Sequence, residues 1–313
     1  MRTVSFRVWV ERAGDAVALA RPTLLIPLWT MHLMGALRAA DWPRFWSPDA
    51  EFLLLSGSHT LLAAAAHILN QIADMESDRA NGKLFLLADG LAPLRFAYAE
   101  MCALAASAVG LALLRGAFDV PFCLLMLSGA MGAAYSAAPF RLKCRAGWDL
   151  LSNSVGYGCV AFALTGYSGL GSEIWLASAP YVLSVGAVFL FTAVVDMEGD
   201  GAVGCRTSAV ALGRRRSALL GAALMLCACG LGFWAGDLPV GVAAAIASPL
   251  YLRSAVRVWR GGFDRQMTRA SQWAILALSG AAVFHAPWYA LVLGLTVLWA
   301  RVYYAWRFEM RYP

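Results

Sequence analysis

The sequence predicts an all-α, polytopic membrane protein, a helical bundle with nine or ten transmembrane helices. The 313-residue chain is 60% hydrophobic and has a mean hydropathy of +0.63, whereas soluble domains are about 45–50% apolar. Apolar runs of about twenty residues recur along it, and each is long enough to cross ~30 Å of hydrocarbon as a helix. Strand-period alternation is absent from the sequence, which argues against an outer-membrane barrel.

The apolar runs define the expected helices in order. A short interfacial helix carrying Trp9 precedes them, and the spans are placed at 17–37, 51–73, 93–114, 119–138, 149–170, 174–195, 216–236, 238–258, 267–285 and 287–305. Pro287 follows the ninth span closely, so nine helices plus one re-entrant or interfacial segment is the alternative. No linker or soluble domain interrupts the apolar pattern, and residues 1–313 are expected to form a single integral-membrane domain.

The basic residues predict the orientation. With ten helices, one side of the membrane receives only Arg38, Arg44 and Arg115, and every other Lys and Arg falls on the opposite side. Because Lys and Arg are enriched in cytoplasmic loops, both termini and the most basic loops are expected in the cytoplasm. The net charge of +6 is explained by this topology, and no nucleic-acid partner is expected.

The seven cysteines lie mostly within apolar segments. Their spacing matches no zinc or redox motif, so buried, reduced thiols are expected.

Two acidic segments, 74–82 and 196–204, repeat each other at their Asp, Met, Glu, Asp, Ala and Gly positions. Each copy follows a long apolar run, and both fall on the predicted cytoplasmic side. A charged residue near hydrocarbon costs several kcal/mol, so the carboxylates require compensation.

The spacing within the repeats predicts a metal site. Asn70, Asp74 and Asp78 are four residues apart, as are Asp196 and Asp200, and on a helix this spacing places side chains on one face. Oxygen ligands favour Mg²⁺, which commonly binds through carboxylates together with substrate phosphates. We therefore expect two facing clusters that hold Mg²⁺ and a diphosphate.

The same residues also have purely structural interpretations. Carboxylates at helix ends are often merely solvated, and Arg79 could pair with Asp78, but two similar copies on one face favour the metal site. Glu76 and Glu198 lie off the Asp stripe and are expected to be solvated or paired. His67, one turn deeper than Asn70, is interpreted as a satisfied buried histidine rather than a residue that orients an acceptor.

In order and spacing these motifs resemble the UbiA superfamily of intramembrane prenyltransferases. The resemblance covers residues 20–215. It rests on Arg21-Pro22, on Asn70 to Asp78, on Tyr135 to Lys143, on Gly147 to Asn153, on Asp196 to Asp200, and on Gly204, Thr207 and Leu212-Gly213. The chain departs from the family pattern in three places. Gln71 stands where many members have Asp, and segment 83–90 lacks the Arg-Pro pair that many members carry. The predicted tenth helix is the third departure.

The resemblance implies a bundle around a central cavity that opens sideways to lipid. It also implies Mg²⁺-dependent transfer of a polyprenyl group from its diphosphate to an aromatic or lipid acceptor. Asn70, Asp74, Asp78, Asp196 and Asp200 would hold the magnesium and diphosphate, with the four aspartates as the catalytic residues. The substrate-binding residues would be Asn70, the cations Lys83, Arg141 and Lys143, and the lining residues Tyr135 and Asn153. Arg206 is a weaker candidate cation. Aromatic side chains that could stabilise an allylic cation are Trp29, Tyr157, Phe162 and Phe189.

Two other functions remain open at this point. A terpene cyclase on the same scaffold would direct the cation to the substrate's own double bonds and would need no acceptor. A cation-coupled transporter is less favoured, because transporters usually keep ionisable groups near the midplane of the membrane.

Overall fold

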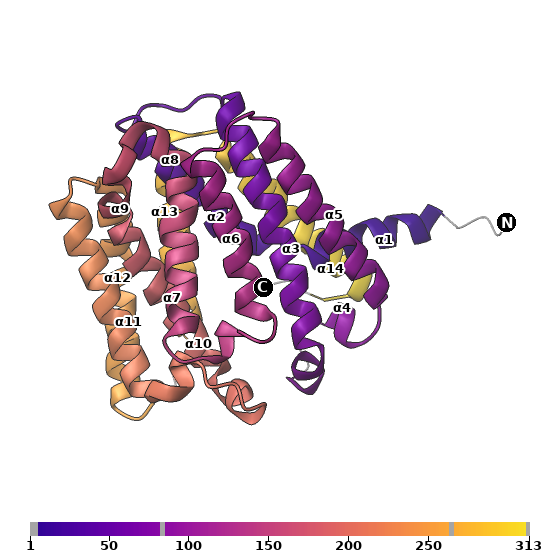
Figure 1. Ribbon diagram of the computed structural model, residues 1–313. Helices are drawn as coiled ribbons and strands as arrows, with labels where there is room; N and C mark the ends of the chain where they lie inside the picture. Colours follow the sequence, from indigo (N-terminus) through magenta and orange to yellow (C-terminus); the bar gives the residue numbers. More distant parts are fainter. Residues whose placement is uncertain (1–5, 82–84, 263–265, 311–313) are drawn as a thin grey trace.

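The computed structural model describes residues 6–81, 85–262 and 266–310, and in these ranges it has helices and no strand. The helices lie side by side in a bundle, from which α1 projects at one flank (Figure 1). Their bounds are α1 Phe6–Leu19, α2 Pro22–Ala39, α3 Ala50–Asn81, α4 Phe85–Ala88, α5 Leu94–Leu113, α6 Val120–Ser136, α7 Trp148–Val155, α8 Phe162–Leu170, α9 Ile174–Ala177, α10 Ala179–Ala202, α11 Ser208–Trp234, α12 Leu238–Trp259, α13 Met267–His285 and α14 Tyr289–Phe308. Three short segments complete the order: η1 Leu142–Cys144, η2 Gly156–Ala161 and η3 Gly171–Glu173. The predicted all-α fold class is confirmed.

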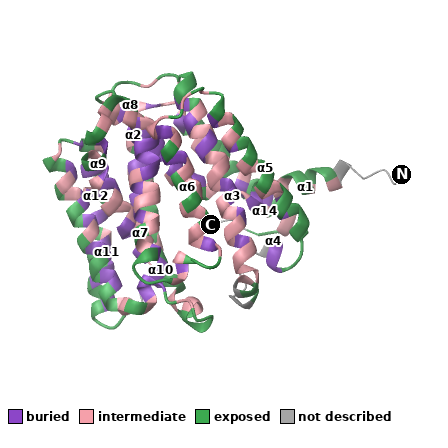
Figure 2. Cartoon of the chain, in the orientation of Figure 1, coloured by how far each residue is buried: buried purple, intermediate pink, exposed green. Residues whose placement is uncertain are grey.

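The outer surface of the bundle is apolar, as a membrane protein requires. Buried residues concentrate on the central helices, and exposed ones face outward (Figure 2). Many outward-facing side chains are large and apolar, including Trp234, Leu276 and Leu291, and a patch of this extent suits a lipid environment. Six described helices are long and apolar enough to cross a membrane, and seven if the bent pair α1–α2 is one span. The chain is an integral, multi-pass membrane protein, whereas the count of nine or ten crossings stays a prediction.

The first predicted span, 17–37, is divided at Arg21. Arg21 adopts the left-handed conformation (φ 53°), and α2 begins at Pro22 with a bend of 48° relative to α1. Proline lacks an N–H and restricts the residue before it, so a helix often ends there. The Asp15 carboxylate of α1 is buried, and it accepts a hydrogen bond from the Tyr303 hydroxyl of α14 at 2.6 Å.

Two helices extend beyond their predicted spans and so position the acidic repeats. α3 has 32 residues and is therefore about 48 Å long, longer than the ~30 Å of hydrocarbon. Its last turns carry Asp74 and Asp78. α10 continues to Ala202, so it carries Asp196 and Asp200 in its last turns, and Gly204 with φ +73° follows it. Gly204 supplies the left-handed conformation that ends many helices. Gly82, the corresponding glycine of the first acidic segment, lies outside the described residues.

The fifth predicted span, 149–170, is a continuous helical run that changes type along its length. α7 and α8 are joined by η2, a π-helical segment, and such segments often mark functional positions. α8 packs very closely against α2, since a Cβ added to Gly35 would lie 2.0 Å from the Phe162 carbonyl oxygen.

Gly35→Val is therefore expected to destabilise the bundle by about 1–3 kcal/mol, because the added atoms must push α2 away from α8. The matched control is Gly110→Val in α5, where an added Cβ meets nothing within 4 Å. Thermal unfolding of the two variants in detergent measures the difference. Equal unfolding temperatures for Gly35→Val and Gly110→Val would contradict the close α2–α8 contact.

Candidate active site

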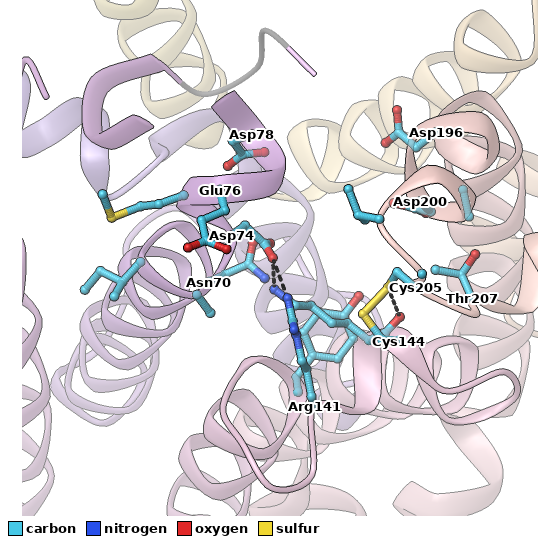
Figure 3. Close-up of a pocket in the computed structure, with 18 of the residues that line it drawn as sticks. Asn70, Asp74, Glu76, Asp78, Arg141, Cys144, Asp196, Asp200, Cys205 and Thr207 are labelled. Atoms are coloured by element: carbon cyan, nitrogen blue, oxygen red, sulfur yellow. Dashed lines mark hydrogen bonds and ion pairs between the residues drawn. A yellow bond between two sulfur atoms is a disulfide. The ribbon is translucent and has the colours of Figure 1, made fainter. Parts of the chain in front are cut away.

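A cavity of about 1180 Å³ opens where α3, α10 and two connecting loops meet. Figure 3 shows its two acidic walls: Asn70, Asp74, Glu76 and Asp78 lie on one side, and Asp196 and Asp200 lie across from them. The two walls come from the two halves of the acidic repeat. All five residues predicted to hold metal therefore line a single cavity.

The best-defined interaction at the cavity joins Asp74 to the loop after α6. The Lys143 ammonium lies 2.5 Å from the Asp74 carboxylate, and the Arg141 guanidinium lies 3.8 Å from the same oxygen. Lys143 is only 8% exposed. Burial lowers the pKa of its ammonium, and the neighbouring Asp74 partly offsets this effect. The predicted cations Arg141 and Lys143 thus contact the first acidic wall.

A disulfide joins the two loops that border the cavity. Cys144, at the end of η1, is bonded to Cys205, which follows α10, and both residues line the cavity. The expectation that all seven thiols are reduced is therefore wrong for this pair. The two cysteines are 61 positions apart in sequence, and only the fold brings them together. The other five cysteines are free.

A buried carboxylate ties the same two loops together a second time. Asp149, at the start of α7, is fully buried and accepts a hydrogen bond from the Ser208 backbone N–H at 2.6 Å, and another from the Ser208 hydroxyl. The Ser208 hydroxyl oxygen in turn accepts a hydrogen bond from the Gly147 N–H at 2.8 Å. This network fixes the loop that carries Lys143 against the start of α11.

The donor atoms of the cavity suit a hard cation. Asp74, Asp78, Asp196, Asp200 and Asn70 offer only oxygen ligands, which fits Mg²⁺. Within 6–81, 85–262 and 266–310, no three acidic, His or Cys side chains form a cluster that could hold an ion by themselves. The donors stand on opposite walls, so an ion held here would complete its shell with water and phosphate oxygens.

The structure places the remaining predicted residues, Tyr135, Asn153, Arg206 and Lys83, differently from one another. Tyr135 lines the acidic cavity, whereas Asn153 lines two adjoining cavities instead. Arg206 forms a backbone bridge with Arg145 and is not among the lining residues. Lys83 lies outside the described residues.

The two glutamates of the repeat behave differently from each other. Glu198 forms an ion pair with Arg214 at 2.8 Å and is 85% exposed, which agrees with the expectation of a paired residue. Glu76 is exposed and lines the acidic cavity together with Asp74 and Asp78, although it lies off the Asp stripe.

Two smaller cavities adjoin the site inside the bundle. One, of about 250 Å³, also contacts Arg21 and Asn70 and has His59, His67, Ser128 and Ser136 in its wall. The other, of about 270 Å³, is lined mainly by apolar side chains, among them Pro27, Met31, Val185, Phe189 and Leu278. Leu24, Asn153 and Tyr157 line both and form the wall between them.

The expected aromatic side chains are split between cavities and core. Tyr157 and Phe189 line the adjoining cavities. Phe162 is fully buried against Tyr181, and Trp29 donates a hydrogen bond to the Thr60 hydroxyl at 2.9 Å. Phe162 therefore serves packing rather than the site.

The sequence assigned no site role to several lining residues, although two of them belong to the motifs of the resemblance. Arg21 contacts two cavities, and its place before Pro22 was the available signal. Thr207 lines the acidic cavity and caps α11 by accepting a hydrogen bond from the Val210 N–H; a threonine just before a helix is a recognisable cap. No sequence signal indicated Cys144 and Cys205.

Comparison with known proteins gives a consistent result. The model of the UbiA prenyltransferase family matches residues 24–276. A UbiA homolog from Archaeoglobus fulgidus bound to GPP and Mg²⁺ is 18% identical with a TM-score of 0.62, over 87% of this chain and 99% of that one. A UbiA homolog from Aeropyrum pernix K1 in its apo form is 20% identical with a TM-score of 0.64, over 84% and 98% of the two chains. At these identities the likeness establishes the fold. Comparison with curated proteins finds no matching sequence.

The disulfide predicts a defined labelling pattern. In the denatured protein without reductant, a thiol-alkylating reagent is expected to label Cys102, Cys123, Cys159, Cys227 and Cys229. Cys144 and Cys205 should be labelled only after reduction. Peptide mass spectrometry measures the pattern, and labelling of Cys144 before reduction would contradict the bond.

Proposed function

The chain belongs to the UbiA prenyltransferase family, and from that membership we propose that it moves a polyprenyl group from its diphosphate to a hydrophobic or aromatic acceptor inside the membrane. The observation that supports this most is the pair of acidic walls facing each other across one cavity beside Lys143 and Arg141. A cavity that combines carboxylates with cations suits a ligand that is itself anionic and metal-bound.

In this proposal Asn70, Asp74, Asp78, Asp196 and Asp200 hold magnesium and the donor diphosphate. Bound Mg²⁺ would neutralise the negative charge that develops on the departing diphosphate. The UbiA homolog from Archaeoglobus fulgidus has been observed with GPP and Mg²⁺, which supports the choice of ligand and ion.

Lys143 and Arg141 supply positive charge from the chain itself. Both approach the same oxygen of Asp74. The two cations are therefore already directed toward the place where a phosphate group would bind beside this carboxylate. Donors that are fixed before the reaction stabilise developing charge at little cost of reorganisation. Lys83 is proposed as a further cation on the first loop.

The adjoining cavities suit the two organic parts of the reaction. We assign the apolar cavity beside Phe189 to the prenyl chain, where exclusion of water would protect an allylic cation. The cavity beside His67 is assigned to the acceptor, because its polar groups could hydrogen-bond a hydroxyl. A separate acceptor space favours transfer over cyclisation. Tyr157, in the wall between the two, has its hydroxyl 3.3 Å from His67 Nε2.

Asp74→Ala or Asp196→Ala is expected to reduce Mg²⁺-dependent diphosphate release by about 100-fold or more, because each removes a carboxylate from one wall. Glu198→Gln is the matched control, since Glu198 belongs to the repeat but pairs with Arg214. Release is measured with a radiolabelled prenyl diphosphate in membranes. Full turnover by either alanine variant would refute the assignment, and release that needs no acceptor would instead indicate a cyclase.

Tyr157→Phe is expected to raise the KM for the acceptor by roughly fivefold, the value of about one neutral hydrogen bond, and to leave the KM for the donor unchanged. Tyr251→Phe serves as control, because Tyr251 stacks on Phe191 away from these cavities. A change confined to the donor KM would reverse the assignment of the two cavities.

A further inference from the structure

A polar pocket of about 250 Å³ lies between α12 and α13, separate from the cavities of the reaction. Its wall contains two arginines, Arg253 and Arg269, together with Ser254, Gln266 and Trp273. α12 lies on the outer flank of the bundle (Figure 1). The pocket is therefore at the lipid-facing surface rather than in the interior.

The position of the pocket along its two helices suits the expected boundary between hydrocarbon and headgroups. Arg253 is six residues before Trp259, the last residue of α12, and so lies roughly 9 Å along the axis from the helix end. Arg269 is the third residue of α13. Trp259 and Trp273 are more than half exposed on the same two helices, and exposed tryptophans are typical of the membrane interface.

Among the described residues, no carboxylate lies in the wall of the pocket. In the described part of the chain, neither Arg253 nor Arg269 has a hydrogen bond or an ion pair with another residue, and both are exposed. A guanidinium at this depth is costly unless it reaches water or an anion. Two guanidiniums in one pocket offer the fork geometry that binds phosphate oxygens in pairs.

We propose that this pocket binds the phosphate group of an anionic phospholipid. The two arginines would contact the phosphate oxygens, Gln266 and the Ser254 hydroxyl would add polar contacts, and Trp273 would lie beside the upper acyl chains. The lipid would thereby be held against α13. The same helix also lines the apolar cavity through Ala274, Ile275 and Leu278.

The test is native mass spectrometry of the full chain in neutral detergent, titrated with phosphatidylglycerol or phosphatidylcholine. The wild type is expected to retain phosphatidylglycerol preferentially, and Arg253→Gln/Arg269→Gln should weaken that binding roughly tenfold, as loss of charge-assisted bonds implies. The matched control is Arg260→Gln/Arg301→Gln, which removes the same charge from exposed residues outside the pocket. Equal weakening in both double variants would overturn the proposal, because it would indicate general charge attraction.

Two further arms make the result specific. Arg253→Lys/Arg269→Lys preserves charge and removes the fork, so it should weaken phosphatidylglycerol binding while thermal unfolding stays as in the wild type; unchanged binding would overturn the role of the guanidinium pair. Inorganic phosphate distinguishes the source of the ligand. If phosphate alone bound the wild type and displaced phosphatidylglycerol at equal concentration, the ligand would be a soluble anion and the lipid assignment would be wrong.

Discussion

The arrangement of the site depends on one constraint, the cost of holding carboxylates at the edge of a hydrocarbon layer. The chain meets it by extending α3 and α10 past their apolar stretches, so that Asp74 and Asp200 lie at an open cavity rather than against lipid. Lys143 compensates Asp74 directly at 2.5 Å. The length of α3 and α10 and the position of the cavity at their ends are consistent with this constraint.

The loops around the cavity are fixed by redundant connections. A disulfide and the buried Asp149 carboxylate join the same two segments, and the Arg145–Arg206 backbone bridge lies between them. In the proposed reaction this placement matters, because the attraction between an ammonium and a developing negative charge weakens with distance. Lys143 is therefore held by groups that take no part in the chemistry themselves.

The sequence predicted those features that follow from local pattern. The spans follow from runs of apolar residues, and the shared face of Asn70, Asp74 and Asp78 follows from helical periodicity. Features that depend on contacts between distant segments were not accessible, namely the Cys144–Cys205 bond and the cavity in which Asn153 lies. The break at Arg21 is an intermediate case, because Pro22 is visible in the sequence but the apolar run 17–37 continues on both sides of it.

The two walls of the cavity are joined to the loop that carries Lys143 in different ways. On the α10 side, the chain is covalently joined to the loop that carries Lys143. On the α3 side, the same loop contacts Asp74 through the Lys143 ion pair, which is reversible. A ligand anion that took Lys143 away from Asp74 would break this ion pair, whereas the disulfide would keep the Lys143 loop joined to the α10 side. The Lys143 loop would then stay with the second wall of the cavity while its contact with the first wall is exchanged for the ligand.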